Sequence, residues 1–285
     1  MQTQNIIILV FLFSQSLVAQ QVLTADSLLK TNVISMQAIG LGGYSGECIN
    51  VEIENFSDNV IKVEIESGRR FVSLDSGEQD ILVVKPNIVT IQPKKKFLSK
   101  LFGFCCQASM HAPNKNSKFY KSFLAPKEWR ELTQYLSQNA AIEVFTMQSA
   151  VWVMSDNRPI KNVGVLNNTD VQLRKKLAEI KKIIVPWYNI SYKEKDLTPA
   201  SDFNTAKPLM FNAELEVNIP HTGILNAYIM DKDKRIVNYL LQDSYTSEGK
   251  QTFIFNQSLV RYKKGKYKLI IQNENGFFLE KDFEI

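Results

Sequence analysis

Two stretches in the first half of the chain alternate strictly between apolar and polar residues. Residues 48–54 read Cys-Ile-Asn-Val-Glu-Ile-Glu, and residues 60–66 read Val-Ile-Lys-Val-Glu-Ile-Glu. This two-residue period is typical of β-strands that bury one face, and the polar residues between the two stretches have the composition of a turn. Shorter runs predict further strands at residues 70–74, 81–84, 88–91 and 97–108. Strands this short and evenly spaced predict a β-sandwich.

A helical period replaces this alternation between residues 126 and 186. Pro126 suits the first turn of a helix. Residues 140–154 carry apolar side chains three and four positions apart, which favours a second helix, although the Val and Trp residues in this stretch also suit a strand. Asn168-Thr169-Asp170 predicts the cap of a third helix, and Pro186 marks its end.

The last part of the chain returns to short alternating runs. Residues 191–209 are polar and contain two prolines, so we expect a linker there. Residues 231–234 read Asp-Lys-Asp-Lys and predict a hairpin turn. The predicted strands are residues 213–217, 224–230, 235–241, 252–255, 267–271 and 277–283.

This closing segment resembles the immunoglobulin-like domains near the C-termini of many secreted Bacteroidota proteins. The resemblance is carried by Tyr228-Ile229-Met230-Asp231, Gly249 and residues 265–269, Gly-Lys-Tyr-Lys-Leu. The segment lacks the initial Asn-Pro motif and the basic final strand of the version that directs type IX secretion. The resemblance therefore implies an accessory domain.

These patterns predict a mainly β fold with added helices, of the α+β class. We expect a signal peptide over residues 1–20, a β-sandwich with a helical segment over residues 21–190, the linker over residues 191–209, and an immunoglobulin-like β-sandwich over residues 210–285. A motif resemblance described below implies a thioester-like domain within residues 21–190.

The N-terminal segment predicts export. Residues 6–13 are wholly apolar, and Ala19 offers a small residue for cleavage. The run is shorter than the ~20 residues of a transmembrane helix, and no later segment approaches that length, so we expect no transmembrane segment. A buried N-terminal strand is the alternative. Export places the chain in the periplasm, on the outer surface or outside the cell.

Composition and charge agree with a folded exported protein. Hydrophobic residues make up 45% of the chain, enough for a core. The net charge of +5 is mild, and the basic runs at residues 94–96 and 174–176 suit solvated surfaces. No aromatic RNA-binding signature accompanies them. We therefore expect a protein or a cell-surface ligand as partner, and no nucleic acid.

The chain contains three cysteines, Cys48, Cys105 and Cys106. In an oxidising compartment two of them are expected to pair. Adjacent cysteines rarely bridge each other, so the candidate disulfide joins Cys48 to Cys105 or to Cys106. Either pairing leaves one of the three cysteines as a free thiol.

A second interpretation uses Cys105 differently. Phe104-Cys105-Cys106 and residues 147–152, Met-Gln-Ser-Ala-Val-Trp, resemble in order and type the paired motifs of thioester domains in bacterial surface adhesins. The resemblance implies an internal thioester between Cys105 and Gln148, which a lysine amine of another protein would open to form a covalent amide. Met147 departs from the threonine usual in that motif.

Other catalytic chemistry is less favoured. His111 is near Cys105 in sequence, but it precedes Ala112-Pro113 in a polar loop without a marked orienting residue, so a cysteine hydrolase ranks last. No ligand spacing indicates a metal or a cofactor. The sequence thus predicts a non-enzymatic interaction protein of the cell envelope or surface, an adhesive or scaffold module. A covalent thioester adhesin is the alternative.

Overall fold

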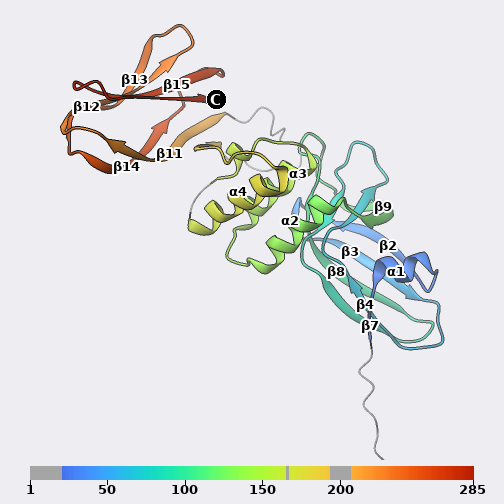
Figure 1. Ribbon diagram of the computed structural model, residues 1–285. Helices are drawn as coiled ribbons and strands as arrows, with labels where there is room; N and C mark the ends of the chain where they lie inside the picture. The colour runs from blue at the N-terminus through green and yellow to red at the C-terminus, as the bar shows by residue number, and fades with distance from the viewer. Residues whose placement is uncertain (1–20, 165–166, 193–206) are drawn as a thin grey trace, which may run out of the picture.

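The computed structural model describes residues 21–164, 167–192 and 207–285. The fold is mainly β with added helices, as predicted. The expected signal peptide and most of the expected linker lie outside the described residues. Figure 1 shows three parts along the chain: a β-rich part, a group of helices, and a second β-rich part.

Six strands of the first part close into a barrel, in the order β2-β3-β8-β6-β5-β9. The predicted N-terminal β-sandwich is therefore wrong. The closing strand is β9, which pairs antiparallel with both β2 and β5. Alternation along a strand is the same in a sandwich and in a barrel, so the closure depends on β2 and β9, two strands that the sequence analysis did not identify. The strands are β2 (Ile34–Leu41), β3 (Ser45–Asn55), β5 (Arg69–Ser73), β6 (Ile81–Val83), β8 (Lys96–Cys105) and β9 (Lys115–Leu124).

A small sheet, in the order β1-β4-β7, and a short helix accompany the barrel. Their apolar residues join the barrel interior in one core, as Val63, Val89 and Leu28 illustrate. The elements are β1 (Val22–Thr24), α1 (Ala25–Lys30), β4 (Ile61–Ile65) and β7 (Asn87–Ile91).

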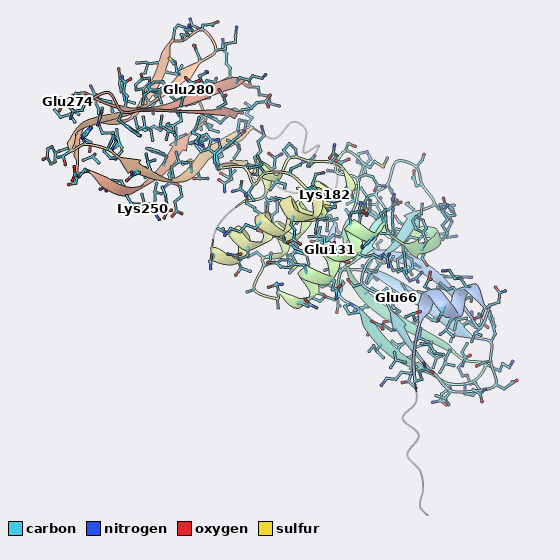
Figure 2. All side chains as sticks on the ribbon, in the orientation of Figure 1. Glu66, Glu131, Lys182, Lys250, Glu274 and Glu280 are labelled. Carbon is cyan, nitrogen blue, oxygen red and sulfur yellow. The ribbon has the colours of Figure 1, made fainter. Side chains whose placement is uncertain are left out.

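The helices form a separate core against the outside of the barrel. The last helix begins at an Asn167 cap, whose side chain accepts a bond from the Asp170 N–H, and it ends at Lys182, where the backbone turns left-handed before Pro186 is reached. Glu131 of α2, labelled in Figure 2, forms an ion pair with Lys176 of α4, with 2.6 Å between Glu131 Oε1 and Lys176 Nζ. The elements are α2 (Lys127–Gln138), α3 (Val144–Ser155), the 3-10 helix η1 (Ile160–Asn162) and α4 (Asn168–Lys181).

The barrel strands that face the helices are buried on both sides. Along β6 and the end of β8, successive residues pack alternately in the barrel core and in the helical core. Ile81 and Cys105 belong to the barrel core, whereas Leu82, Phe104 and Cys106 belong to the helical core. This double burial explains the continuous apolar runs in the sequence at these two places.

Two antiparallel sheets make up the third part, in the orders β10-β11-β14 and β13-β12-β15-β16. They enclose one core that includes Phe211, Leu225 and Ile271. Their strands are β10 (Tyr188–Tyr192), β11 (Pro208–Ile219), β12 (Gly223–Asp231), β13 (Ile236–Thr246), β14 (Gly249–Ser258), β15 (Lys266–Asn273) and β16 (Phe278–Glu284).

Strand β10 precedes residues 193–206 yet belongs to this third part. It pairs with β11, and Ile190 is fully buried in the shared core. The Arg174 guanidinium of α4 donates to the carbonyl oxygens of Pro186 and Tyr188 (3.0 and 2.6 Å), and burial lowers the pKa of Arg174 to about 10. Lys161 of η1 donates to the Glu284 carbonyl (2.9 Å). These contacts join the helices to the C-terminal sheets.

Candidate functional site

Gln148 and Cys105, forty-three residues apart in the chain, meet where α3 packs on the end of β8. The Gln148 Nε2 donates to the Cys105 carbonyl (2.8 Å), and the Cys105 N–H donates to Gln148 Oε1 (3.2 Å). Both residues are fully buried. The carboxamide thus makes the pair of bonds that a neighbouring strand would make.

The Gln148 side chain hydrogen-bonds β8 at the point where its pairing with β3 ends. Strand β3 pairs with β8 only from Ser45 onward, opposite Phe104. The Cys105 N–H also donates to the Tyr44 carbonyl (2.9 Å), while its carbonyl is satisfied by the Gln148 side chain. Two helical turns later, Ser155 Oγ donates to the Cys106 carbonyl (2.5 Å). The sequence motif around Gln148 therefore anchors α3 to the barrel.

The three cysteines are free thiols, and they lie on two sides of β8. Cys48 and Cys105 pack in the barrel core, whereas Cys106 packs in the helical core. Burial raises the pKa of Cys48 to about 12 and raises the pKa values of Cys105 and Cys106 above the ordinary range. Thiols in this state are protonated and poor nucleophiles.

The strand register separates Cys48 from the other two cysteines. The Cys105 N–H bonds to Tyr44, four residues before Cys48. Cys48 itself lies at a bulge of β3, level with Leu101 and Phe102 of β8. At a rise of about 3.3 Å per residue, its offset from Cys105 is roughly 10–13 Å along the strand, whereas a disulfide joins Cα atoms no more than about 7 Å apart. A bridge from Cys48 to Cys105, or to Cys106 one residue beyond, would need β3 or β8 to shift.

The position of the Gln148 carboxamide also bears on the thioester interpretation. The Gln148 carboxamide faces the main chain of Cys105, while the Cys105 side chain packs among barrel residues on the opposite side from Phe104. Both polar atoms of the carboxamide are engaged in hydrogen bonds. The Gln148 side chain therefore contacts the backbone of Cys105. The thioester bond between the two residues stays a prediction. His111 is exposed, in contrast to the buried Cys105 thiol.

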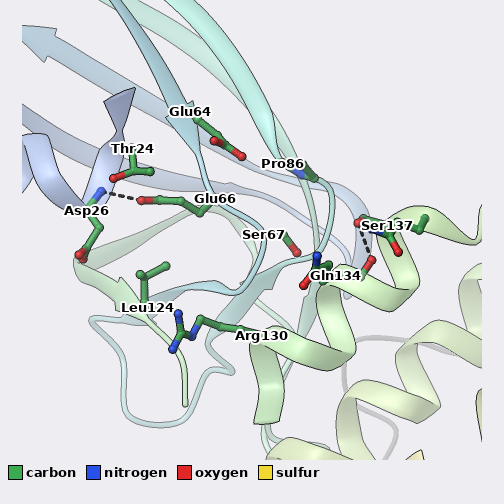
Figure 3. A pocket seen from close by; sticks show the side chains of 11 residues that line it. Thr24, Asp26, Glu64, Glu66, Ser67, Pro86, Leu124, Arg130, Gln134 and Ser137 are labelled. Carbon is green, nitrogen blue, oxygen red and sulfur yellow. Dashed lines mark hydrogen bonds between the residues drawn. The ribbon is translucent and has the colours of Figure 1, made fainter. Parts of the chain in front are cut away.

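A groove of about 510 Å³ lies between the small sheet and α2 (Figure 3). Its carboxylates include Asp26 and Glu66, which flank the fully buried Arg69. Arg69 Nε lies 2.8 Å from Glu66 Oε2, and Arg69 Nη2 lies 3.7 Å from Asp26 Oδ1. A hydrogen bond from Lys30 is the main cause that lowers the pKa of Asp26. Asp26 and Glu66 are engaged in ion pairs with Arg69 and Lys30, so these two carboxylates stabilise the packing around Arg69.

A third feature was missed by sequence reasoning: the outer face of the four-stranded sheet. We use this name for the side opposite the shared core. Tyr228 pairs with Tyr239, and their rings lie 5.7 Å apart. The signal was present, since residues 224–230 read Ile-Leu-Asn-Ala-Tyr-Ile-Met, apolar at both odd and even positions. The large side chains of the outer face include Ile224, Tyr228, Met230, Ile236, Tyr239, Tyr245, Ile270 and Phe278.

Within the residues that the structure describes, no three His, Cys, Asp or Glu side chains are grouped to hold a metal ion. In the same residues, no helix combines the length and apolar character needed to cross a bilayer. No protein-family model and no curated protein matches this chain.

The free, buried thiols predict a specific count in alkylation. We expect no modification of the native protein, and three modified cysteines after unfolding without a reducing agent, because each thiol is at most 1% exposed. Intact mass measures the number of added groups. One reactive cysteine would indicate the disulfide. Two reactive cysteines, together with an intact mass lower by one ammonia before alkylation, would indicate the thioester.

Proposed function

We propose that the chain is an exported interaction protein of the cell envelope or surface, an adhesive or scaffold module without enzymatic activity. In this proposal the C-terminal unit is an immunoglobulin-like β-sandwich, and its outer face contacts a protein or a cell-surface ligand. The observation that carries the proposal is the set of large apolar and aromatic side chains on that face.

These side chains remain accessible to solvent. Tyr245 is 75% exposed and Phe278 is 57% exposed, at opposite edges of the sheet. On the same face Ile270 lies between Tyr228 and Glu280 and is fully buried. Clustered exposed apolar residues mark interaction sites on soluble proteins, and tyrosines contribute large contact areas at protein interfaces.

The buried thiols support a non-catalytic interpretation of the rest of the chain. Burial raises their pKa values and so disfavours the thiolate that a cysteine hydrolase requires. A nucleophile beside a base is not needed to explain Cys105, because its contacts with Gln148 anchor a helix.

The proposal is tested by binding of the labelled mature chain to intact cells and purified envelope fragments. We expect saturable binding, which a Tyr245→Ser and Phe278→Ser double variant weakens at least about tenfold because interface energy concentrates in large aromatic anchors. The matched control is Ile254→Ser with Val260→Ser, two residues that are 67% and 72% exposed but do not lie on the outer face. Equal loss in both variants, or no saturable binding, contradicts the proposal.

A further inference from the structure

Strand β9, which closes the barrel beside β2 (Figure 1), carries positive charge without negative charge around it. Its three lysines, Lys115, Lys118 and Lys121, are all exposed. Neither β9 nor its two neighbours, β2 and β5, contain an aspartate or a glutamate. Among the residues that the structure describes, no carboxylate forms an ion pair with any of the three lysines. This side of the barrel therefore has an uncompensated positive charge.

Aromatic rings lie among these lysines. The register between β9 and β5 shifts at Tyr120, which has no partner in β5 and is 56% exposed. Such bulges re-aim side chains relative to a regular strand. The Lys121 ammonium lies 4.8 Å from the centre of the Tyr120 ring and 5.9 Å from the centre of the Phe123 ring. The two rings and the lysine between them are therefore on one side of the strand.

This side of the strand faces away from both cores. Phe119 is buried in the barrel core, so the preceding Lys118 points outward together with Ile39, its partner on β2. Ile39 is 40% exposed, and Leu74, directly after β5, is 63% exposed. No buried residue of β2, β5 or β9 belongs to the helical core, so the helices leave this surface open. We call it the lysine-aromatic face, and its members are Ile39, Leu74, Lys118, Tyr120, Lys121 and Phe123.

Arg70 of β5 holds one end of the lysine-aromatic face in place. Its guanidinium carbon lies 5.9 Å from the centre of the Phe123 ring and 5.4 Å from the centre of the Trp129 ring of α2. The Arg70 Nε donates to Oδ2 of the buried Asp80 (2.7 Å). Because Asp80 neutralises Arg70, this arginine positions the Phe123 ring without adding to the net charge of the face. A ring that is already positioned loses little freedom when a partner binds.

We propose that the lysine-aromatic face binds an acidic polysaccharide. The carboxylates of such a polymer complement the unpaired ammonium groups, and the C–H faces of its sugar rings pack against the negative faces of aromatic rings. Single-stranded nucleic acid also combines charge with stacking. The choice of a polysaccharide rests on the proposed location at the cell envelope. The face itself is independent of the outer face of the C-terminal sheet, because it belongs to the barrel.

Isothermal titration calorimetry of the mature chain with polygalacturonate, an acidic polysaccharide, tests the proposal. We expect saturable binding that weakens as the salt concentration rises, and no binding to neutral dextran. Lys118→Gln combined with Lys121→Gln should raise the Kd at least about tenfold, because it removes the positive charge that attracts the polymer. The matched control is Lys263→Gln with Lys264→Gln, two exposed lysines just before β15, and it should leave the Kd unchanged.

Replacement of Tyr120 separates stacking from charge. Tyr120→Ser keeps every lysine, so we expect the Kd to rise at least about threefold at each salt concentration, because packing against the ring is not screened by salt. Tyr245→Ser, at a residue that is 75% exposed on the outer face of the four-stranded sheet, is the control and should have no effect. Thermal unfolding of each variant confirms that it is folded.

Three outcomes overturn the proposal. The first is the absence of saturable binding to polygalacturonate. The second is a loss of binding in the control lysine variant equal to that in the Lys118 and Lys121 variant, or an unchanged Kd in the folded Tyr120→Ser variant. The third is tighter binding to an oligothymidylate or to vesicles of anionic phospholipid than to polygalacturonate, which would assign the face to nucleic acid or to a membrane surface.

Discussion

A fragment of residues 187–285 is expected to fold, whereas a fragment of residues 207–285 is expected to remain unfolded. Both contain every strand from β11 to β16, and they differ in β10. Ile190 of β10 is fully buried, and Trp187 just before it packs edge-on against Phe211 and Phe283, with ring centroids 5.8 and 6.3 Å away. The shorter fragment loses these contacts and exposes one side of β11.

The burial energy that the shorter fragment loses is comparable to the whole free energy of unfolding of a small domain. Burying a large apolar side chain contributes about 2 kcal/mol, and a small domain is stable by only about 5–15 kcal/mol in total. Loss of Trp187, Tyr188 and Ile190 together removes a comparable amount. Thermal unfolding followed by circular dichroism measures the outcome. A cooperative transition at the same temperature for both fragments would show that β10 is dispensable.

Replacement of Gln148 by glutamate is expected to destabilise the protein by at least about 3 kcal/mol at neutral pH, the scale of an unpaired buried charge. The new carboxylate has no hydrogen to donate to the Cys105 carbonyl, which now accepts from Gln148 Nε2 at 2.8 Å. Two oxygen atoms would face each other in a fully buried site. Only the protonated acid can restore the lost bond.

The pH dependence of the Gln148→Glu variant follows from this preference for the protonated acid. Burial and the facing carbonyl raise the folded-state pKa of the introduced carboxyl group above its unfolded value of about 4.3. The variant is therefore least destabilised below the unfolded pKa, and it loses stability as pH rises through the folded pKa. Urea unfolding at a series of pH values measures this trend relative to the parent chain.

Gln148→Leu is the matched control for that experiment. It removes both hydrogen bonds without adding charge, so we expect a loss of about 1–3 kcal/mol that does not vary with pH relative to the parent. A Gln148→Glu variant as stable as the parent at neutral pH would show that the contact with Cys105 does not anchor α3.

Local patterns in the sequence predicted individual elements better than their assembly. The alternation in residues 48–54 and 60–66 correctly indicated β3 and β4. Closure of the barrel was not predictable from it, because β9 reads Lys-Asn-Ser-Lys-Phe-Tyr-Lys-Ser-Phe-Leu and is too polar to be recognised as a strand. Its role depends on pairing with β2 and β5, which are distant in sequence.

The candidate site shows the same limit at the level of side chains. The sequence motifs singled out Gln148 and Cys105 for a bond through sulfur, and the structure has them in contact through the Cys105 backbone. The side of β8 on which each thiol packs depends on the strand's pleat. That pleat directs Cys105 into the barrel and Cys106 toward the helices.

The position of β10 changes how residues 193–206 connect the molecule. They join two neighbouring strands of one sheet, β10 and β11, whose partners run from Tyr188 opposite Ala213 to Tyr192 opposite Pro208. A cut in this segment would therefore leave two pieces with matching edges rather than two separate domains. The chain thus contains a natural split point, at which a non-covalent complex could be rebuilt from complementary halves.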